Sequence, residues 1–300
     1  MIRTLAAASG LALALGAVSL AQDAPEVEIT DLGNGLYQLS TGMAGNVGVS
    51  VGEDGVFMID TQFDSTALAL DAAQREVSGD RAVDLVLNTH LHGDHVRGNA
   101  YFAELGAEIM AHPRVRPALM NPATSELTGS TPEPLSGGYL PTIIVTEGAE
   151  IAMNGLTARL HHEPDAHTNT DIWVHWPEAD VIHAGDLLFS GRYPFIDLDN
   201  GGTVAGFIAG MQSIVDAAGP ETTIIAGHGP LSTKADLEAS IAMLTEGRAA
   251  VAALVEEGAD LAAVQAAEPL KDFHDAWNWG FITTERMVWT LYRDITGETE

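Results

Sequence analysis

Apolar positions along this chain change their spacing, and the changes separate predicted strands from predicted helices. Short apolar runs that end at polar residues or glycine are typical of buried strands. The runs fall into two similar halves, at 27–29, 35–40, 46–51, 55–59, 83–88 and 108–111, and then at 142–145, 150–153, 156–161, 171–176, 180–183 and 222–226. Because strands come in two groups with helical segments between and after them, we expect two packed sheets with helices outside.

The helical spacing is clearest in the last third of the chain, although 65–77 and 99–105 also fit helices. Thr233 has the character of an N-cap, with Asp236 three positions later, and an apolar face then continues until Gly258. A second apolar pattern ends the chain. Between these helices lie four aromatic residues, which we interpret as helix packing rather than substrate stacking, namely Phe273, Trp277, Trp279 and Phe281.

One connecting segment, 121–141, is rich in proline, serine, threonine and glycine and has no apolar period. Loops of this length are uncommon inside compact domains. The sequence leaves two interpretations open, a lid over a functional site and a disordered insert.

The chemistry of the chain is concentrated at 89–95, Thr-His-Leu-His-Gly-Asp-His, directly after the apolar run at 83–88. Loops held by a rigid sheet are common places for ligands. His90 and His92 are two positions apart and can converge on one ion, whereas Asp94 and His95 point elsewhere, toward a second. Cysteine is absent from the chain, so the donors are imidazole and carboxylate, which suit zinc, iron or manganese, with zinc as the default.

A catalytic zinc usually keeps three protein ligands and one open position, so more donors must come from distant sequence. His167, Asp186 and His228 each lie in a loop or at the end of a predicted strand. Spacing alone does not exclude His162 in place of His167. Asp60, at the end of another apolar run, is interpreted as a carboxylate that orients a ligand histidine instead of binding metal.

Together these residues resemble the metallo-β-lactamase superfamily. The segment 90–95 matches its HxHxDH signature, and a histidine before threonine, a glycine-aspartate pair and a glycine-histidine pair follow in the family's order. The resemblance covers about 28–295 and implies an α/β fold of four layers, the αββα sandwich. It also implies two zinc ions, the first held by His90, His92 and His167, the second by Asp94, His95 and His228, with Asp186 bridging both.

The resemblance and the site predict a zinc-dependent hydrolase. Zinc lowers the pKa of bound water to near neutrality, so a metal-bridged hydroxide can attack a carbonyl carbon without a serine or cysteine nucleophile. Asp94 and Asp186 would fix the hydroxide and help to move its proton. Arg192 is a candidate to hold a substrate carboxylate, and Asn200 is a candidate donor to the developing oxyanion.

The expected substrate is a cyclic amide, opened by a β-lactamase or a promiscuous β-lactamase-like hydrolase. Many dedicated β-lactamases of the family carry another residue where Asp186 stands, which indicates a broader chemistry. The alternatives are a lactonase or glyoxalase-type thioesterase, a non-heme iron sulfur dioxygenase, and a non-catalytic periplasmic zinc-binding protein.

The amino terminus predicts export. Arg3 precedes an apolar segment at 5–20 that is short for a membrane span, and small residues follow it, so we expect a signal peptide at 1–21 with cleavage after Ala21. The remaining 22–300 would form a single domain in the periplasm or outside the cell, without a membrane segment. The net charge of −29 argues against nucleic acid and favours a small-molecule substrate. The oligomeric state is left open.

Overall fold

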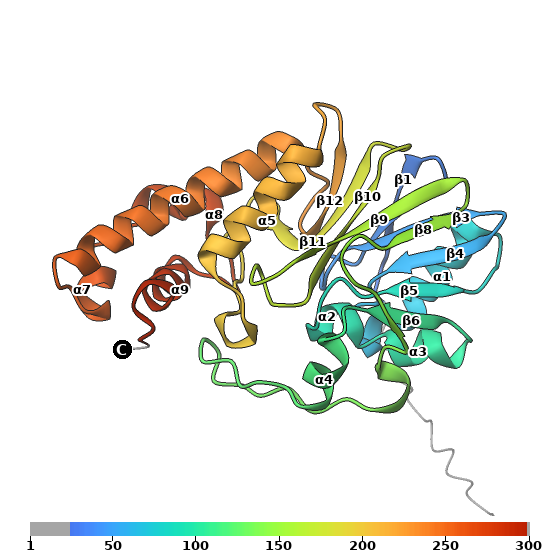
Figure 1. The fold of residues 1–300 in the computed structure, drawn as a ribbon, viewed down its shortest axis with the longest axis horizontal. Coiled ribbons are helices and arrows are strands. Elements are labelled where there is room, and N and C mark those ends of the chain that lie inside the picture. The colour runs from blue at the N-terminus through green and yellow to red at the C-terminus, as the bar shows by residue number, and fades with distance from the viewer. Residues whose placement is uncertain (1–24, 299–300) are drawn as a thin grey trace, which may run out of the picture.

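The computed structural model describes residues 25–298, and its centre consists of two stacked β-sheets (Figure 1). The predicted signal peptide lies outside the described residues. Within them, no helix is both long and apolar enough to cross a membrane.

The first sheet runs in sequence order from one edge to the other. Its strands are β1 (Glu28–Gly33), β2 (Leu36–Ser40), β3 (Val47–Gly52), β4 (Gly55–Ile59), β5 (Leu85–Leu87), β6 (Glu108–Ala111) and β7 (Ile143–Ile144). Strands β1 to β4 pair antiparallel, and β4 to β7 pair parallel. The parallel pairing places the carboxyl ends of β4 and β5 at the same edge, which is where the histidine-rich segment begins.

The second sheet has the order β12-β11-β10-β9-β8. Its strands are β8 (Glu150–Met153), β9 (Leu156–Glu163), β10 (Asp171–Trp176), β11 (Val181–Phe189) and β12 (Thr223–His228). Strands β11 and β12 are parallel, so their carboxyl ends also share one edge.

Helices cover the outer face of each sheet (Figure 1). On the first sheet these are α1 (Asp64–Ser78) and α3 (Asn99–Glu104), and on the second they include α5 (Val204–Ala217), α6 (Lys234–Glu256) and α9 (Thr284–Thr296). The shorter helices are α2 (Gly93–Val96), α4 (Val115–Met120), α7 (Leu261–Ala266) and α8 (His274–Trp277), with single turns η1 (Gly137–Tyr139), η2 (Leu198–Asn200) and η3 (Lys271–Phe273).

A continuous apolar layer joins the inner faces of the two sheets. Ile59 and Leu87 of the first sheet belong to the same buried cluster as Leu160, Val174 and Ile225 of the second. Two further clusters fill the spaces between each sheet and its helices. The four-layer αββα arrangement expected from the sequence is therefore confirmed.

Two predictions about where elements begin and end can be compared with the structure. The capping box of Thr233 and Asp236 is present at the start of α6. The strand predicted at 180–183 was too short, because β11 continues through Asp186 to Phe189. Irregular pairing with β12 on either side of Gly185, which has a φ of 52°, allows the strand to continue while changing the direction of its side chains.

The long connection after α4 has a defined path rather than a regular structure. Its first part, which we call the 121–135 loop, contains an isolated bridge between Ser125 and Ser130 and returns to α4 through the Leu135 N–H, which donates to the Leu119 carbonyl at 2.8 Å. The 121–135 loop is thus held against α4 at its carboxyl end.

Candidate metal centre

Seven side chains from both sheets meet at the edge where the strands end. His90 and His92 come from the loop after β5, and Asp94 and His95 from the first turn of α2. The other three lie far away in sequence, with His167 between β9 and β10, Asp186 within β11 and His228 at the end of β12. The structure brings all seven predicted residues together and leaves His162 outside the groups that could hold an ion.

The first group contains three imidazole nitrogens in a triangle. His92 Nδ1 lies 3.0 Å from His90 Nε2 and 2.8 Å from His167 Nε2, and the latter two atoms are 3.2 Å apart. Each nitrogen carries either a proton or a lone pair, so at least one side of the triangle must join two atoms of the same kind. A cation that accepts all three lone pairs removes this repulsion.

The second group contains one carboxylate and two imidazoles. Asp94 Oδ2 lies 3.2 Å from His228 Nε2 and 3.6 Å from His95 Nε2. Asp186 reaches both groups, because its Oδ1 is 3.2 Å from His95 Nε2 and its Oδ2 is 3.5 Å from His167 Nε2. This is the position expected for a bridging ligand.

Two buried atoms at this junction have no hydrogen-bond partner among the described residues, His95 Nε2 and Asp186 Oδ1. Leaving such groups unsatisfied in a protein interior costs about 1–3 kcal/mol each. A metal ion between them would satisfy both. The donor set of five histidines and two aspartates, without sulfur, therefore fits two divalent metal ions.

The second ring nitrogens of several candidate ligand histidines form hydrogen bonds that hold each ring in place. Asp60 Oδ2 lies 2.7 Å from His95 Nδ1, which agrees with the orienting role expected for Asp60. The Phe195 carbonyl accepts from His167 Nδ1 at 2.7 Å, so the Nε2 of a neutral His167 carries a lone pair. Such contacts fix the ring orientation and the tautomer of a metal-binding histidine.

Asp197 orients His92 in the same way, with 2.7 Å between Asp197 Oδ2 and His92 Nε2. Sequence reasoning missed this residue. Asp197 lies in the irregular segment before α5, more than 100 positions from its partner, and carries no motif that would mark it. Its side chain also accepts from the backbone of η2, which holds it in place.

Charges within the site divide the histidines into two classes. Burial is the main cause that lowers the pKa of His90 well below its ordinary value and the pKa of His167 to about 4. The positive charge of neighbouring histidines lowers both pKa values further. Burial also acts on His228, but Asp186 and Asp94 outweigh it and raise the pKa of His228 to about 9. At neutral pH without metal, His90 and His167 are therefore neutral, whereas His228 carries a proton.

The protonation of His228 predicts that metal binding at the second group depends on pH. A proton must leave His228 Nε2 before a metal can bind there, and this proton is present below about pH 9 and absent above. Burial also acts on His95, the other imidazole of this group, but Asp186, Asp94 and Asp60 outweigh it and raise the pKa of His95 well above its ordinary value. We therefore expect the affinity for the second ion to rise by at least about tenfold per pH unit between pH 7 and 9. Calorimetric titration of the metal-free protein in buffers of different ionisation enthalpy would measure the protons released. A second-site affinity that stays constant over this range would contradict the assignment of His228.

The two groups lie at the floor of an open cleft with a volume of about 480 Å³. Asp94, Asp186 and His228 line it, and Arg192 stands at its wall with its guanidinium 5.0 Å from the centre of the Trp279 ring. Arg192 makes no ion pair with any described residue. Its placement fits the predicted contact with an anionic substrate group.

Asn200 has a different place from the one predicted. It does not line this cleft, and its Nδ2 donates to Asp197 Oδ2 at 2.7 Å. The amide therefore supports the carboxylate that orients His92. Phe273, Trp277 and Trp279 pack against the helical core, as the sequence predicted. Trp279 and Phe281 also line the cleft.

Comparisons with known proteins agree with this geometry. The family model described as "Metallo-beta-lactamase superfamily" matches residues 40–232. Among solved structures, a metallo-beta-lactamase from Pontibacter korlensis is 14% identical, with a TM-score of 0.59, over 73% of this chain and 99% of that one. A metallo-beta-lactamase family protein from Thermus thermophilus is 21% identical, with a TM-score of 0.61, over 75% of this chain and 84% of that one.

A third similar structure is the inverting sec-alkylsulfatase Pisa1 from Pseudomonas sp., at 14% identity and a TM-score of 0.67. The match covers 90% of this chain but only 50% of the sulfatase, so this chain spans about half of that protein's length. At these identities the solved structures show a shared fold.

Proposed function

Because this chain belongs to the metallo-beta-lactamase superfamily of metal-dependent hydrolases, we propose that it is an exported zinc enzyme that opens a cyclic amide of the β-lactam type. The observation that carries the proposal is the pair of ligand groups joined by Asp186 at the floor of an open cleft. The donor set of imidazole and carboxylate favours zinc. When bound, two zinc ions would lower the pKa of a water molecule and polarise the substrate carbonyl.

Residues that line the cleft would transfer the proton, exclude water and bind the substrate. The side chain of Asp94 is one-quarter exposed and faces the cleft, so the carboxylate oxygen that does not bind metal can orient the attacking water and pass a proton to the leaving nitrogen. The apolar wall of Phe189, Trp279 and Phe281 would exclude bulk water from the reacting bond. Arg192 would bind the carboxylate that β-lactams carry beside the ring.

The direct test is hydrolysis of a chromogenic cephalosporin by the purified protein, with and without a chelator, with metal counted in the same sample. We expect turnover that the chelator abolishes and about two zinc ions per chain. Two bound metals without cephalosporin turnover would overturn the cyclic-amide proposal and direct the search to lactones and thioesters. A single iron with oxygen consumption would indicate the dioxygenase alternative.

The role proposed for Arg192 gives a separate prediction. Replacing it by glutamine removes a charge-assisted contact worth about 1.5–3 kcal/mol, so kcat/KM for a carboxylate-bearing cephalosporin should fall roughly 10- to 100-fold, mainly through KM. The methyl ester of the same cephalosporin lacks the carboxylate charge, so its kcat/KM should change little in the variant. Arg159→Gln on the exposed side of β9 is the control. Equal losses for the acid and the ester would contradict the role.

A further inference from the structure

The second ligand group joins residues of both sheets, and we propose that Asn46 is the positioning residue that fixes the distance between its two halves. Asp94 and His95 follow β5 of the first sheet, whereas His228 and the bridging Asp186 lie on β12 and β11 of the second. This inference rests on the two metal ions of the proposed function, but it concerns how the protein holds them and not which substrate it opens.

Asn46 directly precedes β3 of the first sheet, and its side chain is buried. It reaches the end of β12 in the second sheet, where its Nδ2 donates to the Ala226 carbonyl at 2.9 Å and to the Gly229 carbonyl at 2.8 Å. The Asn46 backbone N–H donates to the Gly227 carbonyl at 2.7 Å. One residue of the first sheet therefore bonds to the backbone on both sides of His228.

The end of β12 depends on these contacts because β12 is the edge strand of its sheet. Backbone groups on the open side of an edge strand have no strand partner, and a buried polar group without a partner is costly. Asn46 supplies donors to three of the four carbonyls of 226–229. The fourth carbonyl, that of His228, accepts from the N–H of Ser190, the residue that follows β11, at 2.8 Å. The backbone that carries His228 is therefore held mainly by Asn46.

Asn46 also contacts the segment that carries Asp186. His183 of β11 is fully buried, and its Nδ1 accepts from the Gly185 N–H at 3.2 Å. In a neutral imidazole the other ring nitrogen then carries the proton, so His183 Nε2 donates to the Asn46 carbonyl at 3.2 Å. Gly185 precedes Asp186 at the irregular pairing of β11 with β12. A second series of contacts therefore leads from Asn46 to the bridging ligand.

On the side of the first sheet, the neighbouring Gly45 packs against His95. A Cβ atom at position 45 would collide with the His95 ring, so the backbone lies directly on the imidazole. The Gly45 carbonyl accepts from Nε2 of the fully buried Gln62 at 2.7 Å, which keeps this backbone in place. Residues 45–46 thus contact His95 on one side and the end of β12 on the other. They set the distance between His95 and His228.

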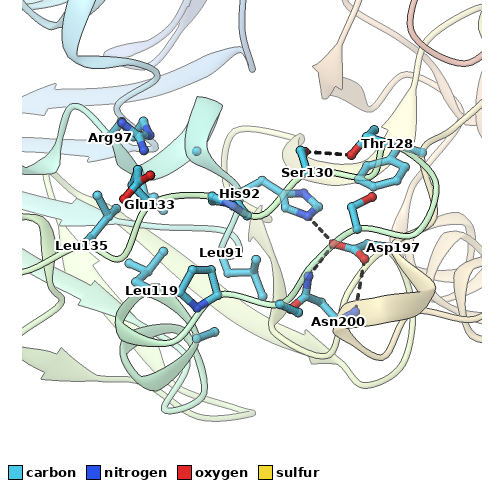
Figure 2. Close-up of a pocket in the computed structure, with 18 of the residues that line it drawn as sticks. Leu91, His92, Arg97, Leu119, Thr128, Ser130, Glu133, Leu135, Asp197 and Asn200 are labelled. Atoms are coloured by element: carbon cyan, nitrogen blue, oxygen red, sulfur yellow. Dashed lines mark hydrogen bonds and ion pairs between the residues drawn. The ribbon is translucent and has the colours of Figure 1, made fainter.

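The first ligand group has supports of its own. Figure 2 shows His92 bonded to Asp197, which in turn bonds to Asn200. His167 is held by a backbone carbonyl at 2.7 Å. None of these contacts involves Asn46. Loss of the Asn46 side chain should therefore act mainly on the second ion.

The test measures stepwise zinc binding to the metal-free protein at constant pH, by calorimetry with a competing chelator. Metal–ligand distances tolerate changes of only about 0.2 Å, and loss of a residue that orients a ligand typically weakens metal binding about 10- to 100-fold. Asn46→Asp keeps the shape of the side chain but replaces its N–H donors by an acceptor. We expect this variant to weaken the second binding step about 10- to 100-fold and the first step less than about threefold.

Asn46→Ala removes the same donors without placing a charge beside the carbonyls, so the test does not depend on one variant folding. We expect it to weaken the second binding step about tenfold.

Asn154→Asp is the matched control. Asn154 also joins the two sheets, because its Nδ2 donates to the Gly55 carbonyl at 3.2 Å and to the Ser50 hydroxyl at 3.1 Å. Gly55 begins β4, whose other end lies at the metal centre, so this contact is away from the metals. Thermal unfolding of the metal-free proteins should show a loss of stability in both aspartate variants. Only the Asn46 variants should lose affinity for the second ion, whereas a merely structural role would leave the two binding steps unchanged relative to each other.

The outcomes are distinct. Equal weakening of both binding steps, or an unchanged second step in Asn46→Ala, would overturn the role of Asn46. If zinc binding follows the expected pattern but no cephalosporin is hydrolysed, the role of Asn46 is supported and the cyclic-amide proposal fails. A natural protein that binds only one zinc ion would overturn both the second ligand group and the role of Asn46.

Discussion

Replacing Asp94 by alanine is expected to reduce hydrolysis at least about a thousandfold while the fold survives. Metal ions supply several kcal/mol of transition-state stabilisation, and each 1.36 kcal/mol is a factor of ten. Asp94 contacts His228 and His95 at the second ligand group, so its loss should reduce the bound metal from two ions to about one. Its side chain is one-quarter exposed, and no apolar contact of the core depends on it.

Activity, metal content and thermal unfolding of the same preparation would check this prediction. Glu104→Ala, at an exposed acid of α3, serves as a control for removing one negative charge. Hydrolysis that persists in Asp94→Ala at a comparable rate would break the assignment of two metal ions. An unfolded variant would contradict the expectation that Asp94 contributes little to the core.

The histidine-rich segment could be predicted well because its ligands are neighbours in sequence and follow a recognisable strand. His90, His92, Asp94 and His95 need only one loop and the first turn of α2 to reach their places. The candidate ligands that lie far away in sequence are harder to predict. His167 and His162 are equally plausible by spacing, and only the pattern of the family resemblance selected His167, which the structure places in the triangle of imidazole nitrogens.

The features that could not be predicted depend on tertiary contacts between distant segments. Asp197 orients His92 across 105 positions. Asn200 is a candidate donor to the developing oxyanion by sequence, whereas in the structure its Nδ2 donates to Asp197 Oδ2. The 121–135 loop has no apolar periodicity, so its path depends on contacts such as the one between the Glu126 N–H and Asp199 Oδ2. Propensity and spacing carry no information about these pairs.

The same reasoning applies to the position of Asp186. The sequence placed it after a short strand, whereas it lies within β11 at an irregularity in the pairing with β12. A continuous run of buried residues on both faces does not reveal where a strand is distorted. In the sequence, only Gly185 before Asp186 and Gly227 before His228 indicate that backbone and side chains approach closely here.

Gly227 provides the second large expected effect. A Cβ atom at position 227 would collide with Asp186 Oδ1 and would lie 2.6 Å from the carbonyl oxygen of Gly185. The carbonyl belongs to the backbone of β11, which cannot yield like the end of a flexible side chain. Gly227→Ala must therefore displace Asp186, the residue that reaches both ligand groups.

Displacement of a catalytic group by about 1 Å can cost about a hundredfold in rate, and forcing extra atoms into a packed interior costs about 1–3 kcal/mol in stability. We expect Gly227→Ala to show both losses, together with weaker retention of both metal ions during dialysis against a chelator. Gly219→Ala is the matched control, because a Cβ atom there would have only an ordinary contact of 3.5 Å with the Thr222 hydroxyl. If Gly227→Ala keeps full activity and metal, Asp186 is not held where the structure places it, and its bridging role fails with it.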